Sequence, residues 1–467
     1  MSQNITTTDR LGTESVGKLL FSLSIPAITA QIVNMLYNLV DRVYIGHIPN
    51  TGALALTGVG LTFPVIMVIS AFSSLIGMGG APRASIAMGR GDHQDAEEIL
   101  GNCFTVLLGL SLGLTAVFLV FSEPLLMMFG ASQQTLPYAL SYLRIYVCGT
   151  IFVQLSLGLN SFITAQGFAK TSMYTVLIGA VANIILDPIF IFALDMGVAG
   201  AAIATVISQG LSALWVLRFL TGPKTKLRIR RRYLRPRLAV MIPVLMLGVS
   251  PFVMSATESL LNIAFNSSLQ KYGGDMAVGA MTILASLMQI LTLPIMGLTQ
   301  GAQPIISYNY GAKNNSRVRQ AFRLLLISSV AFSCLFWITV MAAPRIFVNL
   351  FSTDPVLVET TTWAMGTYMA VAFVMGAQIA CQQAFIALGQ AKISLFLALL
   401  RKIILLIPLI YLLPNFFADK VFAVFLAEPI SDFLAVVTTV TVFAFQFRRI
   451  LAANTVNTAG TVEVGAL

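Results

Sequence analysis

The sequence predicts an all-α membrane protein with twelve transmembrane helices in two six-helix lobes. Three observations lead to this prediction. Hydrophobic residues make up 57% of the 467 residues and charged residues only 10%, whereas soluble domains carry about 25% charged residues. Several charge-free segments exceed the roughly 20 residues that span a bilayer. The two halves of the chain also repeat each other.

The charge-free segments lie at 54–82, 99–122, 145–169, 276–312 and 360–391. Lipid offers no partner to backbone N–H and C=O groups, so such segments are expected to be helical. Apolar periodicity and the positions of Gly, Pro and charges set the helix ends. The first six helices are expected at 19–45, 54–83, 99–121, 138–162, 171–194 and 198–220. The second six are expected at 238–269, 276–308, 318–343, 361–388, 393–413 and 421–445.

These helices divide the chain into five parts. They are a cytoplasmic N-terminus (1–17), an N-lobe (18–220), a basic linker (221–237), a C-lobe (238–446) and a cytoplasmic tail (447–467). The linker holds eight Lys and Arg residues and no acid. Such a segment is typical of a cytoplasmic loop beside anionic lipid, so we do not expect nucleic-acid binding. The remaining basic residues favour the same side, which predicts that both termini are cytoplasmic.

A repeat relates the two halves. Pro82-x-x-Ser85-x-x-x-Gly89 returns 222 residues later as Pro304-x-x-Ser307-x-x-x-Gly311. Six helices per half give both halves the same orientation, an architecture found in transporters whose substrate site lies between the halves. Prolines at related positions predict matching helix bends. These prolines are Pro26 and Pro251 in the first helix of each lobe, and Pro188 and Pro408 in the fifth.

Two carboxylates stand inside the apolar helices of the N-lobe, Asp41 and Asp187. A charge at the bilayer centre costs from about 3 to more than 10 kcal/mol, so each is a functional candidate. Asn34 and Tyr37 share a helix face with Asp41, as Asn183 does with Asp187. Two such polar faces form an oxygen-rich site suited to Na⁺ or to a shared proton. We expect no structural metal and no cofactor.

The C-lobe differs at the related positions. Lys402 stands where Asn183 stands in the N-lobe, and Asn266 stands where Asp41 does. A rise of about 1.5 Å per residue puts Lys402 and Asp432 at one depth, which predicts that they form a structural charge pair. Glu258, Asn262 and Asn266 form a polar stripe on the seventh helix. The stripe either lines the substrate cavity facing the first helix or joins helices by hydrogen bonds.

Enzymatic chemistry has no support in the sequence. The only histidines, His47 and His93, lie in or near predicted loops, and no membrane segment carries an aspartate cluster for a metal-bound diphosphate. A phosphate-binding loop is also absent, because Gly77-Met78-Gly79-Gly80 ends an apolar helix and lacks the strand and lysine of that motif. The chain is therefore expected to be a transporter driven by an ion gradient.

These features together resemble the multidrug and toxic compound extrusion (MATE) transporters, in particular the DinF-like and MepA-like bacterial branch. The similarity runs from Gly17 to Arg449 and includes the Asn-Ile-Ile-Leu-Asp-Pro run from Asn183 to Pro188. It implies a V-shaped cavity between two lobes and a monomer in the bacterial cytoplasmic membrane. It also implies export of amphipathic, cationic compounds, antibiotics among them, in exchange for H⁺ or Na⁺.

Carried over residue by residue, the resemblance implies a cation-coupling site in the N-lobe, with further residues facing the substrate cavity. The implied site is Asp41, Asn183, Asp187 and Thr205, with Tyr37, Tyr142 and Asn160 as neighbours. Glu258 matches an acid found on the seventh helix of some members. The chain departs from a related branch at Gln378, Gln382 and Gln383, where none supplies the expected acid.

Two other functions remain open at this point. A flippase or exporter of lipid-linked or polysaccharide substrates shares the helical repeat, but basic cavity residues for phosphate are few beyond Arg401 and Lys402. A passive channel is the other, and the buried carboxylates and paired bent helices disfavour it. Dye accumulation with and without a proton or sodium gradient distinguishes the three.

Overall fold

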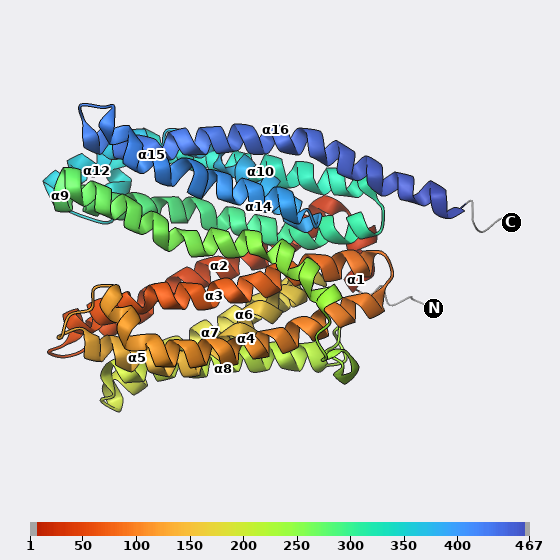
Figure 1. The fold of residues 1–467 in the computed structure, drawn as a ribbon, viewed down its shortest axis with the longest axis horizontal. Helices are drawn as coiled ribbons and strands as arrows, with labels where there is room; N and C mark the ends of the chain where they lie inside the picture. Colours follow the sequence, from red (N-terminus) through yellow and green to blue (C-terminus); the bar gives the residue numbers. More distant parts are fainter. Residues whose placement is uncertain (1–6, 463–467) are drawn as a thin grey trace.

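The computed structural model describes residues 7–462, and the side chains of 10–258 and 260–454. Its described residues form two layers of long helices, with the described chain ends at one end of the molecule (Figure 1). We call this the terminal end. One layer holds α2–α8, which we call the N-lobe, and the other holds α9–α16, the C-lobe.

The N-lobe follows the predicted order of helices. They are α2 (Val16–Gly46), α3 (Gly52–Gly89), α4 (His93–Met128), α5 (Leu136–Cys148), α6 (Thr150–Ala165), α7 (Ala169–Pro188) and α8 (Gly197–Thr221). The helices α5 and α6 meet at 57° and form one broken crossing. A π-helical segment, η1 (Ile189–Ala193), directly follows Pro188, where the missing N–H interrupts the regular hydrogen bonding. Helix α3 continues six residues past its predicted end at Arg83.

The C-lobe is built in the same way. Its segments are α9 (Leu238–Gly311), α10 (Asn315–Ala342), α11 (Pro344–Asn349), α12 (Pro355–Tyr368), η3 (Ala372–Val374), α13 (Met375–Ala387), α14 (Ala391–Leu399), η4 (Leu400–Leu406), α15 (Ile407–Leu412), η5 (Leu413–Asn415) and α16 (Lys420–Val462). The helices α12 and α13 again form a broken crossing, at 54°. The π-helical η4 ends just before Pro408, as η1 begins just after Pro188. Helix α16 extends well beyond its predicted end at 445.

Among the described residues, nine helices are long and apolar enough to cross a membrane, or eleven when each broken pair counts as one crossing. Helix α9 accounts for one more. Its 74 residues are about 110 Å long at 1.5 Å per residue, far beyond the roughly 30 Å bilayer core. It reverses at Gly274, whose φ of 64° and ψ of −160° favour glycine. The fold therefore provides twelve crossings.

Glycines let the two lobes touch backbone to backbone near the terminal end. A Cβ on Gly89 would overlap the carbonyl oxygen of Tyr308, and one on Gly311 would overlap that of Ile86. These four positions are related by the 222-residue repeat, so equivalent atoms meet across the interface. The repeat is thus a structural symmetry, and the lobes are joined where no side chain fits.

The N-terminal helix α1 (Thr7–Thr13) ties the terminal end to the C-lobe. The Arg317 guanidinium donates hydrogen bonds to the carbonyl oxygens of Leu11, at 3.1 Å, and Glu14, at 2.6 Å. The Asn309 amide also donates to the Leu11 carbonyl, at 2.8 Å. The Leu11 side chain is buried among residues of α2, α9, α10 and α13. The start of the N-lobe is therefore packed into the C-lobe.

The basic linker is fixed to the N-lobe by α4. Arg230 forms an ion pair with Glu97 at 2.5 Å, and Arg237 forms one with Glu98 at 2.9 Å. The Asn102 amide donates to the carbonyl oxygen of Tyr233 at 3.1 Å. The linker therefore has a defined path along the terminal end, and most of its other basic side chains are exposed.

Candidate functional site

The two N-lobe carboxylates meet. Asp41 lies on the half of α2 farther from the terminal end, and Asp187 lies on the last turn of α7. The Asp187 side chain is fully buried, and its carboxyl group lies close enough to that of Asp41 for the two to interact electrostatically. One oxygen of each carboxyl group, Asp41 Oδ1 and Asp187 Oδ2, is buried without a hydrogen-bond partner. The pair therefore has unfilled capacity for a proton or a cation.

Polar side chains of α7 and α8 hold Asp187 in place. The Asn183 amide, one helical turn before it, donates to Asp187 Oδ1 at 3.1 Å and to the Thr205 hydroxyl at 3.4 Å. The Thr205 hydroxyl donates to the Ala201 carbonyl oxygen at 3.0 Å. The Tyr142 side chain, another predicted neighbour, is buried in the same lobe. The structure thus brings together Asp41, Asn183, Asp187 and Thr205, the set that the family resemblance implies as one cation-coupling site.

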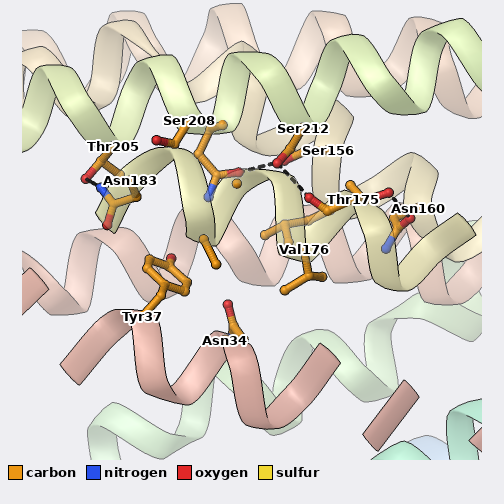
Figure 2. A pocket seen from close by; sticks show the side chains of 14 residues that line it. Asn34, Tyr37, Ser156, Asn160, Thr175, Val176, Asn183, Thr205, Ser208 and Ser212 are labelled. Atoms are coloured by element: carbon orange, nitrogen blue, oxygen red, sulfur yellow. Dashed lines mark hydrogen bonds between the residues drawn. The ribbon is translucent and has the colours of Figure 1, made fainter. Parts of the chain in front are cut away.

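A cavity of about 40 Å³ opens beside Asn183 and Thr205, between α2, α6, α7 and α8 (Figure 2). Three further residues predicted near the site line it, Asn34, Tyr37 and Asn160. A water occupies roughly 10–15 Å³ by this measure, so two or three waters fit. Hydroxyl and amide groups of α6, α7 and α8 supply most of the polar part of its wall.

No base balances the two acids. In residues 10–454, neither Asp41 nor Asp187 lies within ion-pair distance of a Lys, Arg or His side chain. The neighbouring Arg42 points to the Phe63 ring instead, 5.5 Å from its centre. Adjacent helical residues point about 100° apart, so Arg42 influences Asp41 through its charge but forms no ion pair with it.

The C-lobe charges pair differently from the prediction. Lys402 does not bind Asp432; its ammonium contacts the Glu258 carboxylate and donates to the Met254 carbonyl oxygen at 2.9 Å. Asp432 accepts from the Arg401 guanidinium at 2.7 Å. The predicted pair is wrong because depth along a helix fixes the level of a side chain but not its direction. Arg401 faces α16, and Lys402 faces α9.

Arg401 also binds a second carboxylate, that of Glu428, at 3.3 Å. Glu428 and Asp432 are four residues apart on α16 and share one face, and both side chains are buried. This site was not predicted from the sequence, although two acids four residues apart on one apolar helix indicate a buried basic partner. The C-lobe thus pairs three acids with two bases: Arg401 binds Glu428 and Asp432, and Lys402 binds Glu258. The two N-lobe acids have no such ion pairs.

The polar stripe on α9 is separate from the acid pair. Glu258 turns to Lys402 within the C-lobe, and Asn262 and Asn266 are exposed. None of the three lines the N-lobe cavity. A role for them in a substrate cavity stays a prediction.

Comparison with known proteins gives matches over most of the chain. The family model MatE matches residues 26–189 and 251–412. The chain is 28% identical over 425 residues to the multidrug export protein MepA of Staphylococcus haemolyticus (strain JCSC1435), covering 90% of this chain and 92% of that protein. It is 27% identical over 404 residues to the multidrug export protein MepA of Staphylococcus aureus (strain N315), covering 86% and 88%.

Solved structures match as well. The MATE multidrug transporter DinF-BH, solved as a complex with a ligand, superposes with a TM-score of 0.87 and 36% identity, covering 95% of this chain and 98% of that one. A MATE structure in the bent conformation superposes with a TM-score of 0.90 and 22% identity, covering 96% and 99%. The second likeness concerns the fold alone.

Proposed function

The chain belongs to the MatE family of multidrug transporters, and from this premise we propose that it is an antiporter. It exports amphipathic, cationic compounds in exchange for H⁺ or Na⁺ bound by Asp41 and Asp187. As a member of this family it is a multidrug efflux transporter and not an enzyme. The proposal adds the coupling ion and the charge of the substrate.

The observation that carries the proposal is the buried, unbalanced acid pair. Two neighbouring carboxylates cannot both stay ionised without a cation, since their negative charges repel each other strongly. A proton or a sodium ion bound between α2 and α7 removes that repulsion. Such an ion shifts the balance between outward- and inward-open states only by its different affinity for the two. Exchange follows if the ion and the substrate favour opposite states.

The charge of the substrate is inferred from the basic residues. Arg401 and Lys402 are both bound to carboxylates, so neither is free to hold a phosphate. A cationic compound is therefore not repelled by an unpaired positive charge on either of these two residues. This supports drug-like cations over the lipid-linked or polysaccharide substrates of a flippase.

We further propose that the protein is a monomer in the bacterial cytoplasmic membrane with both termini in the cytoplasm. The exposed arginines of the linker lie at the terminal end and suit the anionic inner leaflet. A membrane-impermeant thiol reagent should label a cysteine placed at Arg235 only after the cells are opened. Labelling in intact cells would reverse this orientation.

Neutralising either acid should abolish drug resistance. Asp41→Asn and Asp187→Asn each remove the group that binds the ion, and we expect resistance to fall to the level of cells without the transporter. The matched control is Asp195→Asn, an exposed aspartate eight residues after Asp187. Membrane insertion is checked in each variant by detergent-extracted protein yield. Full resistance in both acid variants would refute the proposed site.

The driving ion is tested with purified protein in vesicles. Efflux of a fluorescent cation is followed under an imposed pH gradient and, separately, an imposed Na⁺ gradient. We expect one of the two gradients to accelerate efflux. If the efflux rate is the same under the pH gradient, under the Na⁺ gradient and without a gradient, the protein is a passive channel and not an antiporter.

A further inference from the structure

A file of polar side chains, interrupted at Gly179, runs through the N-lobe from the acid pair to the terminal end. Three helices supply it. The polar residues of α6 lie four apart, and those of α8 lie one or three apart. Those of α7 share one face but leave a gap of eight residues centred on Gly179. On α7 these are Ser172, Thr175, Asn183 and Asp187. On α6 they are Ser156, Asn160 and Thr164, and on α8 they are Thr205, Ser208, Gln209 and Ser212.

Several hydrogen bonds lie in the half of the file nearer the terminal end, and Figure 2 shows those that Ser212 and Thr175 donate. The Ser212 hydroxyl donates to the Thr175 carbonyl oxygen at 2.9 Å. The Thr175 hydroxyl donates to Asn160 Oδ1, also at 2.9 Å. The Thr164 hydroxyl donates to the Ser172 hydroxyl at 2.9 Å. Ser172 and Thr164 are partly exposed beside the exposed Lys170, so the file reaches the surface there.

The cavity connects this half to the acid pair. It is lined by groups from both, including Asn183 and Thr205 on one side and Thr175 and Ser212 on the other. Gly179 keeps the middle open, since a Cβ there would lie 2.5 Å from the Ser212 hydroxyl oxygen. With room for two or three waters, the cavity spans the stretch between Asn183 and Thr175. Nearer the terminal end, Ser212 reaches Thr175 and Asn160 reaches Ser172 through backbone carbonyl oxygens.

We propose that this file is a proton path that connects Asp41 and Asp187 with the terminal end through the N-lobe itself. Hydroxyls and waters both donate and accept hydrogen bonds, so a proton can pass along them without a charged group at each step. The path is made of N-lobe residues alone, and the coupling ion is H⁺.

The inference rests on the proposed ion-coupled antiport and is tested by blocking the path without touching the acids. Thr175→Val removes a hydroxyl at nearly constant volume, and Gly179→Ala narrows the cavity. We expect each to slow efflux driven by a pH gradient by about ten-fold or more, as loss of a proton-transfer group does. Binding of the fluorescent cation should stay as in wild type, which also shows that the variants fold.

Ser111→Ala is the matched control. Its hydroxyl is equally buried but lies on α4, bonded to the Leu108 carbonyl oxygen and outside the file. We expect efflux by this variant to match wild type. Ser212→Ala provides a milder block should the other two variants fail to bind the cation.

The possible failures are distinguishable. Wild-type efflux driven by Na⁺ and not by pH would overturn the proton path and leave the antiport standing. Wild-type speed in Thr175→Val, Gly179→Ala and Ser212→Ala would also overturn the path, with the acid pair unaffected. Efflux insensitive to either gradient in wild type would overturn the antiport and the path together.

Discussion

The N-lobe and the C-lobe share a fold but differ in whether their buried acids are paired with bases. In the N-lobe, Asp41 and Asp187 meet with no base within reach. In the C-lobe, three acids surround two bases, and Arg401 alone holds both Glu428 and Asp432. Much of the C-lobe charge is therefore neutralised from within. Under the proposed antiport, the N-lobe acids take their positive charge from outside the protein.

Giving the N-lobe a base of its own should erase this difference and have the largest effect. Asn183 occupies the place that Lys402 holds in the repeat, so Asn183→Lys puts an ammonium beside Asp187. We expect gradient-driven efflux to be abolished, because the acid pair no longer needs an external cation. Asn183→Gln is the neutral control and should keep measurable efflux. Persistent efflux in the lysine variant would show that the acid pair does not depend on an external cation.

Removing the central base of the C-lobe should damage folding more than transport. Arg401→Ala leaves Glu428 and Asp432 buried without their partner, and breaking such a buried pair costs about 3–5 kcal/mol. We expect a large fall in thermal stability, measured by loss of monodisperse protein on heating. Arg401→Lys keeps the charge and should lose less. An unchanged melting curve for Arg401→Ala would show that the C-lobe charges are not held by this residue.

The second C-lobe pair should have a smaller effect because Glu258 is half exposed, with 58% of its side chain accessible. Glu258→Lys and Lys402→Glu each place like charges together, and we expect each to lower protein yield. The double exchange should restore the yield. Exchanging Lys402 with Asp432 should not, because these residues do not touch. Rescue by the second exchange alone would contradict the pairing in the structure.

The smallest effect is expected for an ion pair outside the membrane. Hydrogen bonds from Arg10 and Lys18 lower the pKa of the Glu14 carboxyl group below its usual value. A lowered folded-state pKa adds stability above the unfolded-state pKa, and this is lost as the pH falls through the folded-state value. Glu14→Gln should therefore cost less than about 1 kcal/mol at neutral pH and nothing in acid. Thermal melts at both pH values measure this.

The sequence predicts the fold well because lipid restricts the backbone so strongly. Apolar runs locate the helices, and the repeat assigns them to lobes. Asp41 and Asp187 can be found because buried acids are rare in membrane helices. The pairing of Arg401 with Glu428 and Asp432 cannot be predicted from the sequence. Neighbouring residues on one helix face different helices, and the π-helical η4 changes the helical turn at this point. The polar file was also missed, because single serines and threonines are common in membrane helices and only their facing across three helices distinguishes it.

Proton release on substrate binding is the direct test of whether the N-lobe acids carry the exchanged proton. Purified protein in a weakly buffered solution is mixed with a saturating fluorescent cation, and a pH indicator counts the protons. We expect release by wild type and by Glu428→Gln, and none by Asp187→Asn. Release that persists in Asp187→Asn and disappears in Glu428→Gln would place the exchangeable proton in the C-lobe and refute its assignment to the N-lobe acids.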